Sequence, residues 1–231
     1  MMKNIVIINY GSGNIHSAKK AFEKVVADNN LNLNVTVTDD AKELEKAAYI
    51  IVPGVGSFGD CVAGIKKIPK MVDAIKDQVL NNKNPFLGIC VGMQMLAQYG
   101  YEHGKFEGLG LIEGEVAQIE IRSQEAEISK KTLTTNYQLP TTCLKLPHMG
   151  WNNLVEIKKN KITEGFTEKD DFYFVHSYHF ITDDRNVTAK VNYGSNITAI
   201  VNKDNIWGVQ FHPEKSQKTG QKIIKNFLNN S

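Results

Sequence analysis

The chain has 231 residues, 42% of them hydrophobic, and a formal net charge of only +2. A chain of this length and composition can bury one substantial core, so we expect a single domain over residues 1–231. Lys and Arg are interspersed with Asp and Glu, which argues against a nucleic-acid partner. Three cysteines give no disulfide framework, and no stretch approaches the ~20 apolar residues of a membrane helix. We therefore expect a cytoplasmic protein without membrane contact.

The first 52 residues predict strands and helices in alternation. Residues 4–9 form a nearly continuous apolar run, typical of a strand buried on both faces of a parallel sheet. Apolar residues then recur at helical spacing between 15 and 25. Two further strands are expected at 35–38 and 49–52, joined by a short helix that ends at Ala47 and is capped by Asp39 or Asp40.

A glycine-rich turn, Gly11-Ser12-Gly13-Asn14, follows the first strand. Turns of this kind invite a nucleotide-binding interpretation. This one lacks the third glycine of a dinucleotide fingerprint, and no Gly-Lys-Ser/Thr follows it as in a phosphate loop. We therefore expect no nucleotide at this turn, and the sequence predicts no cofactor.

A second glycine-rich stretch, Pro53 to Asp60, follows the third strand. Gly54, Gly56 and Gly59 free the backbone to turn its N–H groups towards a ligand. In open α/β sheets, binding sites form outside the carboxyl ends of the strands. An ordinary strand-to-helix turn is the alternative interpretation.

The segment from Val62 to Val79 predicts a helix whose apolar stripe belongs to the core, and Pro69 should break or kink it. A short apolar strand over 85–90 follows, and then a helix over 93–98. This order of strands and helices predicts an α/β fold with a doubly wound, mainly parallel central sheet and helices on both faces.

The second half predicts shorter strands, which indicate a mixed or antiparallel extension of the sheet. Residues 115–121 alternate like a half-buried strand, whereas residues 122–142 are polar, charged and without a clear period. We expect 122–142 to form a surface excursion. Four more strands and a last helix are expected at 172–176, 187–191, 197–201, 206–210 and 216–228.

Cys90 ends the strand over 85–90 and lies between Gly88 and Gly92. A nucleophile at a sharp strand-to-helix turn needs small residues two positions to either side, because the backbone there is crowded. The start of a helix also favours the thiolate over the thiol. A buried structural cysteine in a core strand is the alternative interpretation, and it is the commonest fate of a cysteine.

The late sequence Phe211-His212-Pro213-Glu214 supplies partners for such a nucleophile. In an extended backbone His212 and Glu214 project to the same side, and Pro213 makes that mount rigid. An imidazole oriented by a carboxylate activates a cysteine and protonates a leaving amine. His-Pro-Glu alone is also compatible with a surface turn. Together with the Gly-x-Cys-x-Gly elbow and the loop 53–60, it predicts a catalytic triad.

Four motifs spread along the chain carry a more specific signal. They are Asn9-Tyr10-Gly11-Ser12-Gly13-Asn14, Pro53-Gly54-Val55-Gly56-Ser57-Phe58-Gly59, Pro147-His148-Met149-Gly150-Trp151-Asn152 and Phe211-His212-Pro213-Glu214-Lys215-Ser216. With them the chain resembles the class I, triad-type glutamine amidotransferases, which have a flavodoxin-like fold. Within that family it is similar to the glutaminase subunits of imidazole glycerol phosphate synthases. The resemblance runs from residue 4 to the last helix, and 122–142 is the main departure.

The resemblance implies an enzyme that hydrolyses L-glutamine to glutamate and ammonia. Cys90 would attack the side-chain amide and form a thioester, His212 would act as general base and acid, and Glu214 would hold its tautomer. Backbone N–H groups of Val55 and Val91 would form the oxyanion hole. The residues that would hold the glutamine are Gly56, Gln94, Ser177 and Tyr178.

The resemblance also implies a partner, a (β/α)8-barrel cyclase subunit that forms a heterodimer with this chain. Ammonia would pass through the barrel to yield imidazole glycerol phosphate and aminoimidazole carboxamide ribotide in histidine biosynthesis. Met149 and Trp151 in the turn 147–152, together with Lys215, would contact the cyclase. Met149 and Trp151 are equally compatible with a core position under a turn.

Other interpretations stay open at this level. A paralogous glutaminase could feed ammonia to another synthase, such as a sugar amidotransferase, and 122–142 leaves the identity of the partner open. A catalytically silent binding subunit of the same fold would lack a triad residue, and none is missing. His103, His148, His176 and His179 show no metal-ligand spacing, so we expect no metal, and Cys61 and Cys143 have no base partner and are expected to be inert.

Overall fold

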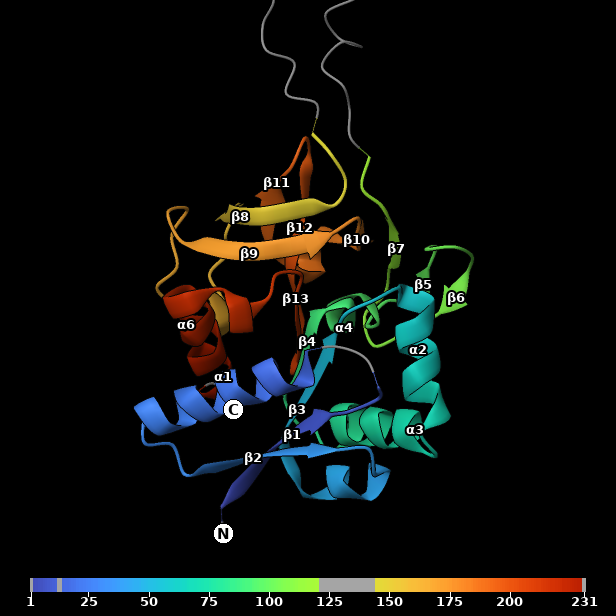
Figure 1. Ribbon diagram of the computed structural model, residues 1–231, viewed down its shortest axis with the longest axis vertical. Helices are drawn as coiled ribbons and strands as arrows, with labels where there is room; N and C mark the ends of the chain where they lie inside the picture. Colours follow the sequence, from blue (N-terminus) through green and yellow to red (C-terminus); the bar gives the residue numbers. More distant parts are fainter. Residues whose placement is uncertain (1, 12–13, 121–143, 230–231) are drawn as a thin grey trace, which may run out of the picture.

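The computed structural model describes residues 2–11, 14–120 and 144–229, and all structural statements refer to these ranges. A nine-stranded mixed sheet forms the centre of the fold (Figure 1). The expected surface excursion at 122–142 lies outside the described residues. In spatial order the strands are β2 (Leu33–Thr38), β1 (Lys3–Ile8), β3 (Ala47–Gly54), β4 (Phe86–Cys90), β13 (Ile206–Val209), β12 (Asn196–Lys203), β11 (Val187–Asn192), β8 (His148–Val155) and β9 (Asp171–His176).

The sheet changes character halfway across, as the sequence predicts. The first five strands in spatial order, β2 to β13, are all paired in parallel. From β13 to β9 every pairing is antiparallel. Strands β1, β3 and β4 are buried almost throughout, which is why they appear in the sequence as continuous apolar runs. The predicted parallel sheet with an antiparallel extension is confirmed.

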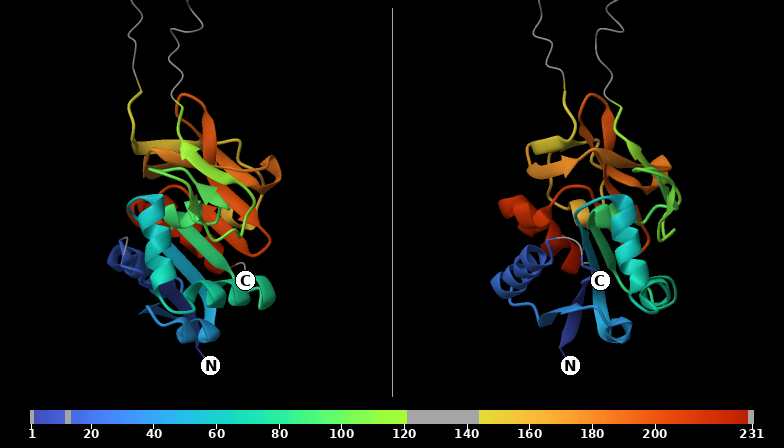
Figure 2. Two further views of the ribbon diagram at one scale, coloured as in Figure 1. Left: turned by 90° about the vertical axis from the view of Figure 1, so that its right-hand side faces the viewer. Right: turned by 45° about the vertical axis from the view of Figure 1, so that its right-hand side comes forward.

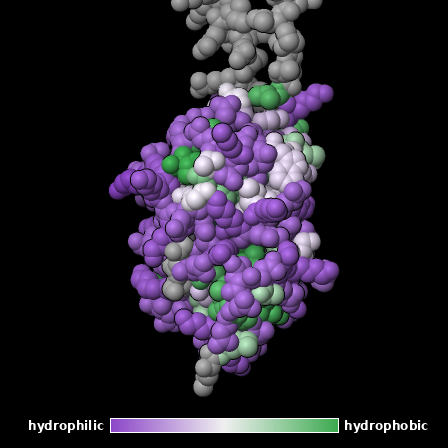
Figure 3. All heavy atoms as spheres, turned by 90° about the vertical axis from the view of Figure 1, so that its left-hand side faces the viewer, coloured by the Kyte–Doolittle hydropathy of each residue, from purple (hydrophilic) through white to green (hydrophobic). Residues whose placement is uncertain are grey.

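Helices cover both faces of the parallel half. Helices α1 (Ile15–Asp28) and α6 (Gln217–Leu228) lie on one face, and α2 (Phe58–Lys67) and α3 (Met71–Lys76) lie on the other (Figure 2). The surface seen from the left of Figure 1 is mainly hydrophilic, with apolar residues in separate patches (Figure 3). Among the described residues, no helix combines the length and the apolar character needed to cross a membrane.

The helix expected over 62–79 is broken where the sequence predicts it. Pro69 lies between α2 and α3, and Lys70 has a left-handed backbone with φ +61°. A π-helical turn, η2 (Asp77–Asn81), continues α3. The short helix predicted before β3 is a 3-10 helix, η1 (Ala41–Lys46), and the side chain of Asp40 caps it by accepting the backbone N–H of Lys42 at 3.0 Å.

The helix expected over 93–98 is wrong in its bounds. Helix α4 begins at Val91, directly after Cys90, and ends at Gln94. The backbone carbonyls of residues 95–97 accept N–H groups from the loop 109–112, so they are unavailable to further helical turns. The chain then enters a second sheet that the sequence did not predict, although the strand expected at 115–121 forms part of it over 115–118. Its strands, in spatial order, are β10 (Tyr178–Ile181), β7 (Glu115–Gln118), β5 (Tyr99–Gly100) and β6 (Phe106–Glu107).

Two glycines allow β4 and α4 to pack directly on neighbouring backbone. A Cβ placed on Gly92 would lie 1.8 Å from the carbonyl oxygen of Val52 in β3. A Cβ placed on Gly88 would lie 2.4 Å from the carbonyl oxygen of Gly92. Both clashes involve backbone atoms, which cannot move aside as a flexible side chain can. The turn at Cys90 therefore depends on glycine at both positions.

We predict that Gly92→Ala lowers the free energy of unfolding by about 3 kcal/mol or more, because β3 and α4 must separate to accommodate the methyl group. Urea denaturation measures the change. The matched control is Gly110→Ala, where a Cβ meets nothing within 4 Å and only the positive φ of +65° opposes it, at a cost of about 1 kcal/mol. Equal losses in the two variants would contradict the proposed packing.

Candidate active site

Cys90 sits on a strained turn at the carboxyl end of β4. Its φ of +55° and ψ of −113° lie outside the regions favoured by residues with side chains. Such strain persists only where the surrounding packing enforces it, and here Gly88 and Gly92 permit that packing. The side chain is only 3% exposed. The sharp strand-to-helix turn predicted from Gly-x-Cys-x-Gly is therefore present.

His212 and Glu214 are brought to the same place by β13, which pairs in parallel with β4. Nδ1 of His212 and Oε1 of Glu214 are 2.8 Å apart, and both side chains are almost fully buried. His212 has the extended backbone that the sequence predicts, but the extended conformation expected for the pair does not continue to Glu214. Pro213 begins a 3-10 turn, η5 (Pro213–Lys215), and this turn folds Glu214 back onto the imidazole.

Hydrogen bonds to both the backbone N–H and the backbone carbonyl of His212 fix its position. Its backbone N–H donates to the carbonyl of Tyr173 at 2.9 Å. Its carbonyl accepts the hydroxyl of Ser216 at 2.7 Å, and the same hydroxyl accepts the backbone N–H of Tyr173 at 3.0 Å. Strand β9 therefore holds the His212 backbone in place, so the imidazole needs little reorganisation to act.

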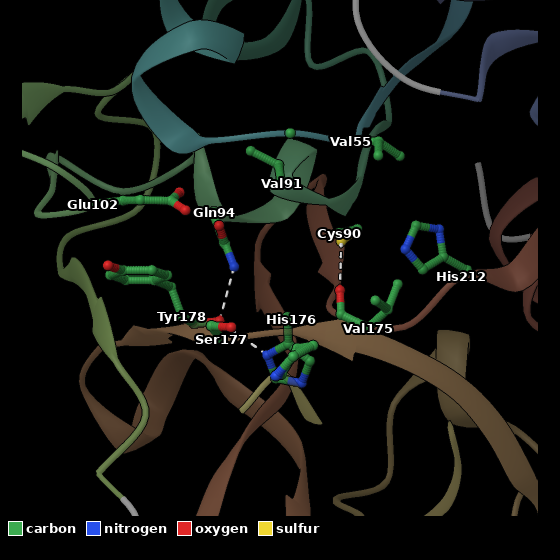
Figure 4. A pocket seen from close by; sticks show the side chains of 12 residues that line it. Val55, Cys90, Val91, Gln94, Glu102, Val175, His176, Ser177, Tyr178 and His212 are labelled. Atoms are coloured by element: carbon green, nitrogen blue, oxygen red, sulfur yellow. Dashed lines mark hydrogen bonds between the residues drawn. The ribbon is translucent and has the colours of Figure 1, made fainter. Parts of the chain in front are cut away.

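The charge state of His212 depends on its neighbours. Burial alone would lower its pKa, but the adjacent sulfur of Cys90 and the carboxylate of Glu214 outweigh burial and raise the pKa to about 10. Because Nδ1 is bonded to Glu214, the buried Nε2 is the nitrogen left for Cys90, and the ring faces that residue in Figure 4. The imidazole of His212 therefore carries a proton at pH 7.

The glycine-rich loop after β3 lies across from Cys90, since Gly54 and Cys90 are register partners. The hydroxyl of buried Tyr10 donates to the carbonyl of Pro53 at 2.7 Å. Val55 is 47% exposed, and Gly56 has φ +123°, a conformation that favours glycine. The loop is thus held at Pro53, whereas Gly56 leaves its backbone free to adopt conformations that other residues disfavour. The predicted oxyanion donor, Val55, lies between these two residues.

A cavity of about 260 Å³ opens over these elements (Figure 4). The residues predicted for the oxyanion hole and for glutamine binding all line it, together with Cys90 and His212, whereas Glu214 lies behind His212. The predicted lining residues are Val55, Gly56, Cys90, Val91, Gln94, Ser177, Tyr178 and His212. Glu102, Pro147, Val175 and His176 complete the wall.

Glu102 is a functional candidate in the pocket wall that sequence reasoning missed. It follows β5, in the small sheet that was not predicted, and its carboxylate accepts the backbone N–H of Phe58 at the start of α2, at 2.7 Å. A single acidic residue in a polar loop gives no signal of its own. Glu102 reaches the wall of the pocket only because its loop folds against the glycine-rich segment at 53–60.

A chain of buried hydrogen bonds runs along one side of the pocket. Nε2 of Gln94 donates to the carbonyl of Tyr178 at 2.9 Å, and Nδ1 of His176 donates to the same carbonyl at 2.9 Å. The other nitrogen of His176 must then accept, so Nδ1 of His148 donates to it at 3.0 Å. Burial lowers the pKa of His148 to about 4 and that of His176 to about 3. Both rings are therefore neutral at pH 7.

Two of the residues expected to dock a partner, Met149 and Trp151, lie on strand β8 and not on a turn, so that part of the prediction is wrong. The third, Lys215, ends η5. Alternation along the strand buries His148 and exposes Met149 (62%) and Trp151 (49%). Trp151 lies edge-on to Tyr173, and the Lys215 ammonium lies 5.7 Å from the same ring. Met149 and Trp151 are therefore not core residues. The partner-docking role itself stays a prediction.

Two further expectations concern metals and the other cysteines. Within residues 2–11, 14–120 and 144–229, no three His, Cys, Asp or Glu side chains group closely enough to hold a metal ion. Cys61 is buried, and its thiol donates to the carbonyl of Val55 at 3.8 Å. Cys143 lies outside the described residues.

Comparison with known proteins agrees with this geometry. The family model for class I glutamine amidotransferases matches residues 6–231. An imidazole glycerol phosphate synthase subunit HisH from Pelagibacter ubique is 42% identical over 98% of this chain and 99% of its own. HisH 1 from Campylobacter jejuni is 42% identical over 96% and 98% of the two chains, and HisH from Cereibacter sphaeroides is 40% identical over 96% and 97%.

Solved structures agree in fold. One, described as a glutamine amidotransferase, has a TM-score of 0.67 at 17% identity over 97% of both chains. A glutamine amidotransferase from Thermotoga maritima has a TM-score of 0.60 at 16% identity, over 99% of this chain and 84% of that one. The chain therefore belongs to the class I glutamine amidotransferase family, and within it to the family of its HisH relatives. The resemblance inferred from the four sequence motifs is confirmed.

We predict that the buried histidine pair makes the fold sensitive to acid. Unfolded histidine takes up its proton near pH 6.5, whereas His148 and His176 do so only near pH 4 and pH 3 when folded. Between these values the unfolded chain binds more protons, so the free energy of unfolding falls as the pH drops from about 6.5 towards 4.

Urea denaturation at several pH values tests this prediction. The fall should be shallower in His148→Gln, which removes one of the two titrating rings. His16→Gln is the matched control, because His16 is exposed on α1 and should leave the slope unchanged. Parallel slopes for the wild type and His148→Gln would contradict the assignment.

Proposed function

We propose that this chain is the glutaminase subunit of an imidazole glycerol phosphate synthase. It hydrolyses L-glutamine to glutamate and ammonia and passes the ammonia to a cyclase subunit, in histidine biosynthesis. The observation that carries this proposal is the convergence of Cys90, His212 and Glu214 at a pocket lined by the predicted glutamine-binding residues. The identity of 40–42% to HisH subunits over nearly the whole chain supports it. The cytoplasmic location expected from the sequence stays a prediction.

The triad geometry supports a double displacement through a thioester. The Cys90 thiolate attacks the δ-carbon of glutamine, and the electron pair of the carbonyl moves onto its oxygen. Nε2–H of His212 gives its proton to the departing nitrogen, so ammonia leaves and a thioester remains. His212, now neutral, takes a proton from water as the water attacks the thioester. Glutamate then leaves, and the thiolate–imidazolium pair is restored. Glu214 holds the imidazole in the required tautomer throughout.

The negative oxygen formed in each step needs donors above Cys90. The backbone N–H of Val91 begins α4, where the first N–H groups have no partner within the helix. The backbone N–H of Val55 is the second donor, on the permissive loop across the pocket. Removing one such donor lowers turnover by about 10²- to 10³-fold. A rotation of the peptide before Val55, set by partner binding, is therefore enough to switch the glutaminase on.

Recognition of free glutamine also requires a partner for its α-ammonium group. Glu102 supplies the one carboxylate among the described residues that line the pocket. The N–H of Phe58 fixes one oxygen of this carboxylate and leaves the other for the substrate. We assign the α-ammonium to Glu102 and the rest of the molecule to Gly56, Gln94, Ser177 and Tyr178.

The exposed face of β8 supports docking of the (β/α)8-barrel cyclase in a heterodimer. Met149 and Trp151 are exposed apolar side chains of the kind enriched at interface centres, and Lys215 lies beside them. Pro147, immediately before β8, lines the catalytic pocket. Ammonia released at Cys90 therefore has a short route to a partner bound at this face. The alternative of a glutaminase for another synthase has no observation in its favour.

We predict that glutamine hydrolysis by the isolated chain is slow and rises when a (β/α)8-barrel cyclase subunit and its nucleotide substrate are added. The partner would complete the oxyanion hole by turning the Val55 N–H towards the pocket. A coupled glutamate assay with and without the cyclase measures the effect. Full turnover by the isolated chain would contradict control by the partner.

Two variants and a matched control sharpen this assay. Cys90→Ala should abolish hydrolysis with and without the cyclase. Trp151→Ala should weaken the stimulation, whereas Tyr101→Ala is the matched control because Tyr101 is a similarly exposed aromatic residue (42%) away from β8. Stimulation that is equally strong in both variants would contradict docking at β8.

We predict that Glu102→Gln raises the KM for glutamine by about 10- to 100-fold, the effect of losing a charged hydrogen bond. The kcat should change much less, because Glu102 does not contact the reacting atoms. Steady-state kinetics measures both constants. Glu107→Gln is the control, since Glu107 is exposed on β6. An unchanged KM would contradict the assignment of the ammonium site.

A further inference from the structure

A fully buried polar side chain, Gln210, lies beside the reacting sulfur, and the triad does not account for it. Gln210 directly follows β13 and is 0% exposed. Its Nε2 donates to Sγ of Cys90 at 3.7 Å, within the range of N–H···S hydrogen bonds. A buried amide that makes a specific contact with a nucleophile calls for a functional explanation.

The neighbours of Gln210 decide which end of its amide faces the sulfur. Nε2 of Gln94 must point to the carbonyl of Tyr178, because a carbonyl can only accept. The same Nε2 also donates to Oε1 of Gln210 at 3.1 Å. Oε1 of Gln210 is thus an acceptor, and its NH₂ group is left to face Cys90. The reversed amide would set two NH₂ groups against each other and turn a carbonyl towards the sulfur.

Further members of the same series of buried hydrogen bonds fix this orientation of the Gln210 amide. The carbonyl of Tyr178 also accepts Nδ1 of His176, which in turn accepts from His148. The amide of Asn152 on β8 donates to the remaining nitrogen of His148 at 3.2 Å. Every donor in this series of hydrogen bonds meets an acceptor. The amide of Gln210 therefore cannot flip without breaking several hydrogen bonds.

The surroundings of Cys90 show why its sulfur needs a donor. The side chain lines the pocket but is only 3% exposed, so water can solvate little of a thiolate there. Helix α4 has only four residues, which gives a much smaller dipole than the sequence led us to expect. The carbonyl of Val175, 4.0 Å from Sγ, is an acceptor and therefore favours the thiol. His212 and Gln210 are the groups that oppose it.

We propose that Gln210 is a catalytic residue that stabilises the Cys90 thiolate through an N–H···S hydrogen bond and so sets the pH at which the nucleophile becomes reactive. Hydrogen bonds to a charged group are stronger than those between neutral groups, so the contact favours the thiolate over the thiol. This role rests on the proposed function, in which Cys90 attacks glutamine.

The test measures Cys90 directly. The intact chain, without glutamine, is alkylated with iodoacetamide between pH 5 and 10, and the Cys90 peptide is quantified by mass spectrometry. In Gln210→Met, the midpoint of the pH–rate profile should move up by about one to two pH units, and alkylation at pH 7 should slow by about tenfold or more. Gln210→Asn, whose amide is too short to reach the sulfur, should show the same shift if Gln210→Met does not fold.

The matched control is Gln78→Met, because Gln78 is also a buried glutamine (6% exposed) but bonds to Asp77 and Asn84, away from Cys90. Its alkylation profile should match the wild type. A wild-type midpoint in the folded Gln210 variants would overturn the proposal, as would a loss of reactivity that is equal at every pH. Because alkylation needs no turnover, a chain without glutaminase activity would refute the proposed function and leave this test intact.

Discussion

The strained backbone of Cys90 is the constraint on which the rest of the site depends. A φ of +55° is tolerated only because Gly88 and Gly92 let β4 and α4 pack on neighbouring backbone. That packing carries the sulfur to the carboxyl end of the parallel strands, between the loop after β3 and the residues that follow β13. His212, Gln210 and the loop after β3 all reach Cys90 through this arrangement of three adjacent strands.

Burial and the presence or absence of an anionic partner together set the charge of each histidine in and around this site. His212 keeps a raised pKa although it is buried, because the sulfur and the Glu214 carboxylate both favour its protonated form. His148 and His176 are buried without such partners, and their pKa values fall. Similar burial thus gives opposite outcomes for histidines in one pocket region. The charged ring lies beside Cys90, and the neutral rings form part of a fixed series of hydrogen bonds.

Local patterns predicted much of the fold and most of the site. Continuous apolar runs revealed β1, β3 and β4, and Pro69 predicted the break between α2 and α3, because these signals are local. The length of α4 and the four-stranded second sheet were missed because they depend on backbone contacts with distant loops. Glu102 and Gln210 escaped for the same reason. Each is an ordinary polar residue in sequence. Only tertiary packing brings Glu102 to the pocket wall and Gln210 to the sulfur of Cys90.

The role of Cys90 as the nucleophile of a glutamine site can be tested without turnover. A glutamine analogue with a diazomethyl ketone in place of the side-chain amide tests it most directly, with the labelled residue located by peptide mass spectrometry. We expect one label per chain, on Cys90, which excess L-glutamine prevents and which Cys90→Ala lacks. Labelling of Cys61 or Cys143 at the same rate would contradict this role of Cys90, as would labelling of Cys90 that glutamine does not slow.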